Sequence, residues 1–299
     1  MKKKRNIIGF ILIALIPLVS ITLNSCGDDD SQDDNSVKVD IYTINPTFVY
    51  GTRLIGSGGT QTINNSWSTG GASFNVFISQ NGKLTDLGKI HSKEDYIDDA
   101  DRKKPLHVKV HIPEDINVNQ RYNVFFVDAP VNAKLSGNRI VCNTELARKS
   151  NLFAGCWYKA EGASNATAQS FYLPTCEGIF ISNNSPKTIT VKLLGYDVQQ
   201  KWYASSGTIS IDPDAKISSN VTSENGEVES DKQKIKAGEE GYILSTYVPT
   251  GKYMKDARLI LEIDGKIVKT PPASSATTIE CGQYYSMNVA WDGDNLEWN

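Results

Sequence analysis

The stretch YYSMNVAWDG, residues 284–293, decides the fold class of this chain. In an extended strand its side chains alternate, so that Tyr285, Met287 and Val289 share one face and the residues between them share the other. The Asp292-Gly293 pair that follows tolerates the positive φ of a tight turn, which favours reversal into an antiparallel neighbour. A strand-length alternating run that ends in a hairpin turn is typical of all-β proteins.

The same pattern recurs along the chain in short runs rich in β-branched and aromatic residues. Strands are expected at 37–42, 72–78, 106–112, 122–127, 178–181, 188–194, 242–248, 257–263 and 284–291. Asn81-Gly82 and Asp264-Gly265 add further hairpin turns. Only residues 143–151 look helical, over about two turns. These features predict an all-β chain of β-sandwich architecture.

A small and polar stretch, residues 160–167, places a domain boundary near the middle of the chain. The predicted organisation is a leader over 1–25, an acidic tether over 26–36, an N-terminal β-sandwich domain over 37–162 and a C-terminal β-sandwich domain over 163–299. Two soft regions, 51–71 and 213–233, are expected to be functional or mobile loops. The second is alternatively a long hairpin that turns at Asn225-Gly226.

The first 25 residues have the layout of a secretion signal. Lys2 to Arg5 provide a cationic start, and an apolar stretch from Ile7 to Val19 follows. This stretch is shorter than the ~20 apolar residues that a membrane-spanning helix needs. The end of the leader, from Leu23 to Cys26, resembles the bacterial lipoprotein signal, in which the Cys is acylated and begins the mature chain. The resemblance implies lipidation of Cys26, with an ordinary signal peptide as the alternative.

The segment that follows Cys26, residues 27–35, contains five Asp and no apolar side chain. It is therefore expected to be a disordered, self-repelling spacer. Acidic residues at this position resemble the export signal that sends Bacteroidetes lipoproteins to the outer face of the outer membrane. The expected location is thus the cell outer membrane, lipid-anchored and facing the exterior. The alternative is that this segment is only a solvated tether and carries no export signal.

Charge excludes one class of partner. Four of the 31 basic residues lie in the leader, which leaves 27 against 34 acidic residues and a net charge of −7 for the mature chain. No run of Lys and Arg offsets this balance. Nucleic acid is therefore not an expected partner, because a polyanion would be repelled.

Cysteine usage fits an exported protein. If Cys26 carries lipid, four Cys remain, and an even number permits two disulfides. The sequence leaves three connectivities open and weakly favours Cys142 with Cys156 and Cys176 with Cys281. Buried, reduced thiols are the alternative. No pair is spaced as C-x-x-C, so neither a zinc ribbon nor a thioredoxin-type site is expected.

No set of residues indicates catalysis. His107 and His111 lie four apart on an expected strand, where they are ~13 Å apart and cannot hold one metal ion between them. The Asp pairs at 212/214 and 292/294 lack calcium-loop spacing and are interpreted as solvated turns, while 95–101 is denser in carboxylates and is the one segment considered for an ion. We expect no enzyme activity, no metal and no cofactor.

The last segment, Glu280 to Trp298, carries a family resemblance. A turn Gly leads to an aromatic residue, an alternating strand, Trp291-Asp292-Gly293 and a final Leu-x-aromatic. This order resembles the closing hairpin of Bacteroidetes fimbrillin-type proteins. The resemblance implies two tandem transthyretin-like or Ig-like sandwiches, a lipoprotein precursor and assembly by strand donation with other fimbrial subunits.

In that family a protease cuts behind an Arg in an N-terminal loop, and the resemblance maps the cut onto Arg53. Loss of the first strand, roughly 37–50, would open an apolar groove that a neighbouring subunit's strand fills. An ordinary loop Arg is the alternative. The chain departs from the family at Trp67–Gly71, which lacks the family's Asp, and in the absence of a tail after the closing hairpin. Tip, anchor and free-standing adhesin roles therefore remain open beside a shaft role.

Together these features predict an outer-membrane surface lipoprotein that acts as a fimbrial subunit or an associated adhesin. The competing hypothesis is a surface glycan-binding lipoprotein of a polysaccharide-uptake system, because flat aromatic rings stack on sugars. The aromatic residues that motivate it are Trp67, Trp157, Trp202, Trp291 and Trp298. The expected partners are accordingly the outer membrane, other fimbrial subunits, and host or microbial glycans or proteins.

Overall fold

The computed structural model describes residues 36–42, 47–51, 58–62, 72–92, 105–143, 153–158, 165–171, 173–197, 204–223, 230–247, 256–274 and 278–299. It describes the backbone alone for 47–51, 58–62, 153–158, 165–166, 169–171, 204–206, 221–223 and 247. Within these ranges the regular secondary structure is all strand apart from one short 3-10 turn, η2 (Ala129–Val131). The prediction of an all-β fold is confirmed.

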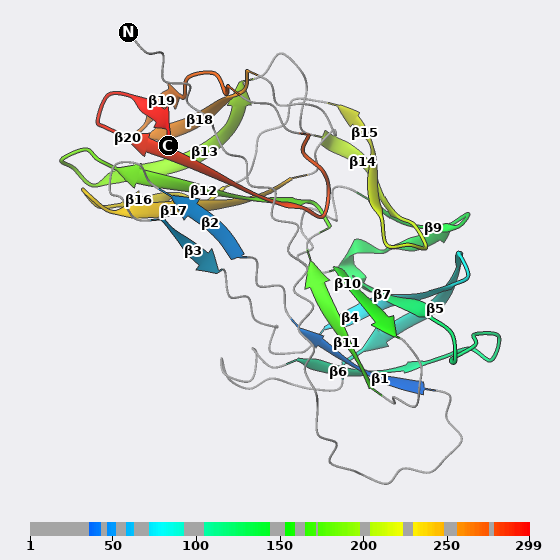
Figure 1. Cartoon of the computed structure of the whole chain (residues 1–299). Coiled ribbons are helices and arrows are strands. Elements are labelled where there is room, and N and C mark those ends of the chain that lie inside the picture. Colours follow the sequence, from blue (N-terminus) through cyan, green and yellow to red (C-terminus); the bar gives the residue numbers. More distant parts are fainter. Residues whose placement is uncertain are drawn as a thin grey trace.

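Seven strands form a sheet, here called the N-terminal sheet, with the order β5-β4-β7-β10-β11-β1-β6. In chain order these are β1 (Ser36–Tyr42), β4 (Ser73–Gln80), β5 (Lys83–His91), β6 (Leu106–His111), β7 (Tyr122–Asp128), β10 (Phe153–Tyr158) and β11 (Asn165–Phe171). The edge strands β5 and β6 contact each other, so the sheet curls back on itself at the bottom of Figure 1. Alternate apolar side chains, among them Val39, Phe74 and Val108, fill the interior of this curl.

Two four-stranded sheets form the C-terminal sandwich, at the top of Figure 1. One has the order β17-β12-β20-β21, with β12 (Thr175–Asn183), β17 (Glu240–Tyr247), β20 (Tyr284–Trp291) and β21 (Leu296–Trp298). The other has the order β16-β13-β18-β19, with β13 (Ile189–Asp197), β16 (Gln233–Ile235), β18 (Arg258–Ile263) and β19 (Lys266–Lys269). Tyr285, Met287 and Val289 lie in the core between the sheets, as their alternation predicts.

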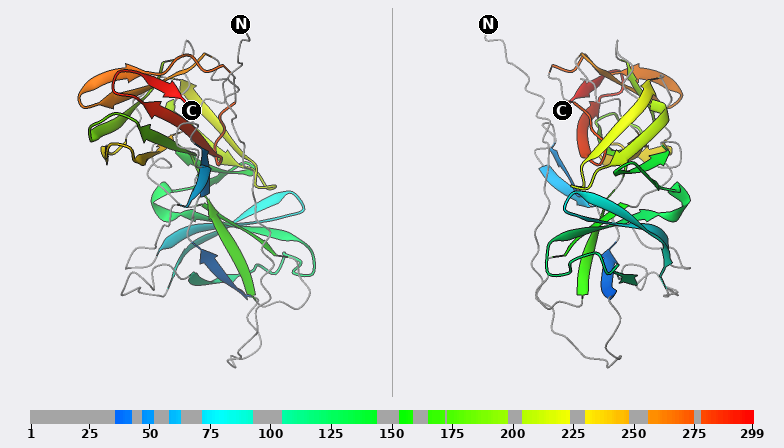
Figure 2. Two further views of the ribbon diagram at one scale, coloured as in Figure 1. Left: turned by 60° about the vertical axis from the view of Figure 1, so that its left-hand side comes forward. Right: turned by 90° about the vertical axis from the view of Figure 1, so that its right-hand side faces the viewer.

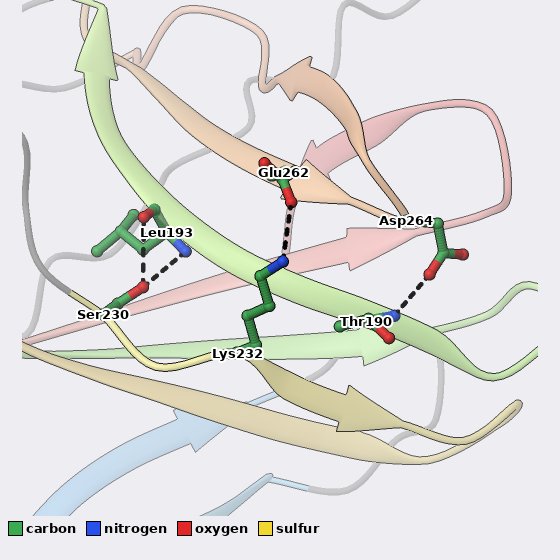
Figure 3. A network of polar contacts seen from close by, with 6 residues as sticks. All are labelled: Thr190, Leu193, Ser230, Lys232, Glu262 and Asp264. Atoms are coloured by element: carbon green, nitrogen blue, oxygen red, sulfur yellow. Dashed lines mark hydrogen bonds and ion pairs between the residues drawn. The ribbon is translucent and has the colours of Figure 1, made fainter.

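Polar contacts extend the second sheet beyond its strands, as Figure 3 shows. β16 pairs with β13 only as far as Val191. Beyond that point the Ser230 side chain continues the ladder, because its Oγ accepts the Leu193 N–H at 2.9 Å. Lys232 then reaches Glu262 on β18, with 3.7 Å between Nζ and Oε1. The segment before β16 is thus held to the sheet by side chains instead of by backbone pairing.

A third unit, here called the bridging sheet, has the order β15-β14-β9-β8. Its strands are β8 (Lys134–Ser136), β9 (Arg139–Asn143), β14 (Ala204–Ile211) and β15 (Ile217–Ser223). It therefore joins two hairpins that lie far apart in the sequence, and both views of Figure 2 show the yellow-green β14–β15 hairpin meeting the green strands. Phe77, Phe125, Ile140 and Ile209 share a core between this sheet and the N-terminal sheet.

The remaining pair of strands is the hairpin of β2 (Thr47–Gly51) and β3 (Gly58–Thr62), which contacts β20. Its second strand, β3, lies within the soft region 51–71, so part of that region is strand and was wrongly expected to be loop. In the region 213–233, residues 217–223 form β15, which pairs with β14 across the connection 212–216; the alternative turn at Asn225-Gly226 lies outside the described residues. The first region is rich in Gly and the second contains several Asn and Asp, and these residue types are depleted in strands, which weakens the sequence signal.

Two predicted turns are confirmed in detail. Asn81 and Gly82 have φ of 51° and 75°, and Asp264 and Gly265 have φ of 49° and 82°, as two-residue type I′ hairpins require. Asp264 also caps β13, because its Oδ1 accepts the Thr190 N–H at 2.8 Å (Figure 3). The third turn differs: the reversal at Asp292-Gly293 is a longer connection that runs to Asn295 before β21 begins.

Some predictions fall on residues that the structure does not describe. They are the leader 1–25, most of the tether 26–36, the helical segment after Asn143, and the boundary region around residue 162. Just beyond that region, β11 pairs with β1 and β10 of the N-terminal sheet. The division into domains 37–162 and 163–299 stays a prediction.

Candidate functional site

The candidate site is the place of β1 in the N-terminal sheet. β1 runs parallel to β11 on one side, with Val39 opposite Ala166, and antiparallel to β6 on the other, with Val39 opposite Val108. Both backbone edges of β1 therefore carry a ladder. The strand comes from the extreme N-terminal end of the described chain, yet it occupies an interior position of the sheet.

Alternate side chains of β1 fasten it to the core. Val37, Val39 and Ile41 are buried, with exposed fractions of 7%, 1% and 0%. Burying side chains of this size stabilises a fold by roughly 1.5–3 kcal/mol each. On the outward face, Asp40 Oδ1 lies 2.7 Å from His107 Nδ1 on β6. β1 is thus held by two ladders, three apolar side chains and one surface polar contact.

The predicted processing site lies between β2 and β3. Arg53 belongs to residues 52–57, which join the two strands and lie outside the described residues. Because β1 and β2 both precede this connection, a cut after Arg53 would separate them from the rest of the chain. Cleavage at Arg53 itself stays a prediction, and so does lipidation of Cys26, which also lies outside the described residues.

Three of the candidate disulfide cysteines can be placed. Cys142, Cys176 and Cys281 are buried free thiols in the structure, and burial raises the thiol pKa of Cys142 and Cys281 to about 12. Such thiols are unreactive at neutral pH because the thiolate is the nucleophile. The structure therefore does not contain the expected bond between Cys176 and Cys281, and the side chain of Cys156 is not described, so its pairing with Cys142 stays a prediction.

The histidines and carboxylates lie as the sequence indicates. His107 and His111 are on the exposed face of β6, and His91 is exposed on β5. Asp212 Oδ1 accepts the N–H groups of residues 214 and 216 at 3.0 and 2.8 Å, so it caps its own turn. Asp292 does the same, and the backbone N–H groups of Asn295 and Asp294 lower its pKa. In the part of the chain that is described, no group of three or more metal-ligating side chains occurs, and 95–101 lies outside it.

The tryptophans bear on the glycan-binding alternative. Trp291 is buried in the core of the C-terminal sandwich, and Trp298 packs against the same core and donates from Nε1 to the Pro271 carbonyl at 2.7 Å. Trp291 is thus buried, and Trp298 is half-buried. Trp67 and Trp202 lie outside the described residues and the side chain of Trp157 is not described, so the alternative stays untested at these three positions.

One buried charged residue was missed by the sequence analysis. Glu177 on β12 is fully buried, and burial raises its pKa to about 7 against the effect of a hydrogen bond from Tyr196. A signal was present in the sequence. Glu177 precedes Ile179 by two residues and Ile181 by four, so on a strand it lies on the same face as these two core residues. Extending the expected strand from 178–181 back to Thr175 would have placed a carboxyl group in the interior.

No protein-family model matches the chain, and no curated protein sequence matches it. Several solved structures are similar in fold. A candidate cell adhesion protein from Bacteroides uniformis has a TM-score of 0.47 at 10% identity, covering 88% of this chain and 94% of its own. Another from Bacteroides ovatus has 0.39 at 11%, covering 86% and 93%. The fimbrial anchor protein Mfa2 from Porphyromonas gingivalis has 0.36 at 9%, covering 89% and 95%.

Two of these are candidate cell adhesion proteins and the third is a fimbrial anchor protein. At identities near 10% and TM-scores below 0.5, the likeness concerns overall architecture and carries no argument about activity. The described residues include no helix long and apolar enough to cross a bilayer.

Proposed function

We propose that this protein is a lipid-anchored protein of the outer-membrane surface that acts as a fimbrial subunit or an associated adhesin. The placement of β1 supports the proposal most directly. The strand lies inside a sheet, between β6 and β11, and is connected to the remainder of the chain only through the β2–β3 hairpin that contains Arg53. One cut in this connection makes an interior strand removable.

Removal of β1 would leave a groove with a defined chemistry. The groove would have unpaired backbone groups of β6 and β11 along its two walls and the pockets of Val37, Val39 and Ile41 along its floor. Exposed edges of this kind bind extended strands by β-augmentation, in which alternate side chains enter pockets. The matching partner is a strand with apolar residues at every second position, supplied by another subunit.

The anchor follows from the leader. A lipidated Cys26 with several acyl chains would hold the uncut chain durably at a membrane, because each buried methylene contributes ~0.8 kcal/mol. Palmitate labelling of cells that express the chain checks this part. Wild type should incorporate the label and Cys26→Ser should not; equal labelling of both would refute lipidation at this residue.

Treatment of the folded chain with an Arg-specific protease tests the processing step. The expected product begins at Leu54 and forms oligomers, whereas Arg53→Lys stays intact and monomeric. Arg258→Lys is the matched control, because Arg258 is an exposed Arg on β18 away from the hairpin, and it should be cut like wild type. If no fragment begins at Leu54, the polymerising role fails, and the tip and anchor roles remain.

A peptide with the sequence of residues 36–42 tests the groove independently. The cleaved chain should bind this peptide, and the same peptide with Asp in place of Val39 should not bind, because it would place a charge in the apolar floor. Equal binding of both peptides would contradict a groove that selects strands by the apolar side chains at every second position.

A further inference from the structure

Glu177 occupies the core side of an interior strand in the C-terminal sandwich. It lies opposite Ser245 of β17 and opposite Tyr285 of β20, so the three side chains share the face that also bears Ile179. β13 of the facing sheet contributes Tyr196 to the same place. Polar side chains of four strands therefore meet at one end of an otherwise apolar core.

The carboxyl group has fewer partners than an ionised form requires. Tyr196 Oη donates to Glu177 Oε1 at 2.6 Å and lies 2.7 Å from Met287 Sδ. Glu177 Oε2 and Ser245 Oγ are buried, and within the described structure neither has a hydrogen-bond partner. A buried carboxylate without a cation is strongly destabilised, whereas the neutral acid needs fewer partners.

The charged and titratable groups around Glu177 do not neutralise it. β13 presents Tyr196, β20 presents Tyr285, and β17 presents only Ser245 at this position. Tyr285 Oη accepts the Glu280 N–H at 3.0 Å, and burial raises the Tyr285 pKa. Cys176 precedes Glu177 on the same strand, and burial also raises its pKa. No basic side chain of the described residues forms an ion pair with Glu177.

Glu177 also lies where the C-terminal sandwich meets the bridging sheet. Just before it, the Cys176 N–H donates to the Gln283 carbonyl at 3.0 Å, and the Gly282 N–H donates to the Pro174 carbonyl at 3.3 Å. The flanking residues Leu173 and Cys281 belong to the core of the bridging sheet. Any loosening of the sandwich around Glu177 acts directly on this junction.

We infer that Glu177 makes the junction between the C-terminal sandwich and the bridging sheet sensitive to pH: the neutral carboxyl keeps the junction closed, and ionisation loosens it. This inference does not depend on the fimbrial proposal. It assigns a regulatory role to a buried acid that strand exchange does not use.

The direction follows from the pKa of Glu177. Burial raises it from 4.5 to about 7 in the folded chain. When the junction opens, solvated Glu177 regains its ordinary pKa, so the closed state binds the proton more tightly. The contribution to the closed state is complete below about pH 4.5 and is lost as pH rises through about 7.

Amide hydrogen exchange of the full mature chain, corrected for the intrinsic exchange rate at each pH, measures the opening. From pH 5.5 to pH 8 the opening of the first residues of β12 and β20 should increase roughly tenfold or more, while β18 and β19 stay unchanged. Glu177→Gln keeps the shape without the ionisation, so its opening should be independent of pH. Glu262→Gln, a half-buried acid on β18, is the control and should respond like wild type.

An equal opening of wild type at the two pH values would overturn the inference, and this measurement needs no variant. A Glu177→Gln protein with the wild-type pH response would overturn it as well, because another group would then be titrating. If Glu177→Gln fails to fold, carbonyl infrared difference spectra of wild type decide. A carboxyl band that titrates near pH 7 supports the inference, and its absence between pH 5.5 and 8 refutes it.

Discussion

β1 and β12 have the same position in their sheets but different inner faces. Each has one parallel and one antiparallel neighbour: β11 and β6 for β1, β20 and β17 for β12. The inner face of β1 is wholly apolar, whereas β12 places Glu177 in line with Ile179 and Ile181. β1 lies at one end of the described chain, whereas β12 is continuous with structure on both sides.

The inner faces of β1 and β12 thus illustrate two ways in which a sheet can hold a strand. An apolar inner face is independent of pH and accepts any strand of matching alternation, which suits a strand that is to be exchanged. A buried acid ties the strand to specific partners and makes its stability depend on protonation. The following predictions test whether the two strands differ in this way, from the largest expected effect to the smallest.

Val39→Asp should have the largest effect, because it introduces into β1 a buried acid that has no prepared partner. We expect a loss of more than about 4 kcal/mol in the free energy of unfolding, from lost apolar burial and an unpaired charge. Urea denaturation measures it. The control is Lys38→Ala on the exposed side of the same strand, with a change within about 0.5 kcal/mol. Similar effects of both substitutions would mean that β1 does not depend on its inner face.

Tyr196→Phe should have an intermediate effect on the C-terminal sandwich. It removes the hydrogen bond that lowers the pKa of Glu177, so this pKa should rise further above about 7. The expected loss is about 1–3 kcal/mol in the free energy of unfolding at pH 8, and less at pH 5, where Glu177 is neutral in the folded chain. Thermal denaturation at the two pH values measures it.

The control for Tyr196→Phe is Tyr242→Phe, a substitution with the same chemistry at a side chain that is 38% exposed. It should change stability little at either pH. A loss that is the same at pH 5 and pH 8 for Tyr196→Phe would mean that Tyr196 acts by packing and not through Glu177.

Asp40→Ala should have the smallest effect. It removes the contact with His107, in which the two atoms are 2.7 Å apart, against 2.6 Å in the Tyr196–Glu177 bond. The side chains of His107 and Asp40, however, are 53% and 29% exposed. Solvent screening limits such a pair to about 1 kcal/mol or less, and added salt should reduce it further. Asp40→Asn keeps an acceptor without the charge and separates the two contributions. A loss comparable to that of Tyr196→Phe at pH 8 would contradict the contrast between surface and core.

The parts of this fold that follow from local sequence are the strands with clean alternation and the tight turns. β18 is an example, because the run 257–263 predicts the strand and the Asp264-Gly265 turn predicts its reversal into an antiparallel neighbour, which is β19. The pairing of β9 with β14 was not foreseen, since it joins residues such as Cys142 and Ile209 that only the tertiary fold brings together. Glu177 was missed because a charged residue is normally taken to be exposed, although the alternation of side chains along β12 places it on the face that points into the core.

The bridging sheet has a consequence for biosynthesis. The core beneath this sheet combines Phe77 and Phe125 with Ile209 and with Cys281. This core is therefore incomplete until nearly the whole polypeptide has been synthesised. Contacts of such long sequence separation form slowly. If the chain is exported as we propose, it must cross the inner membrane unfolded, and an early core that depends on late residues would delay folding until that passage is complete.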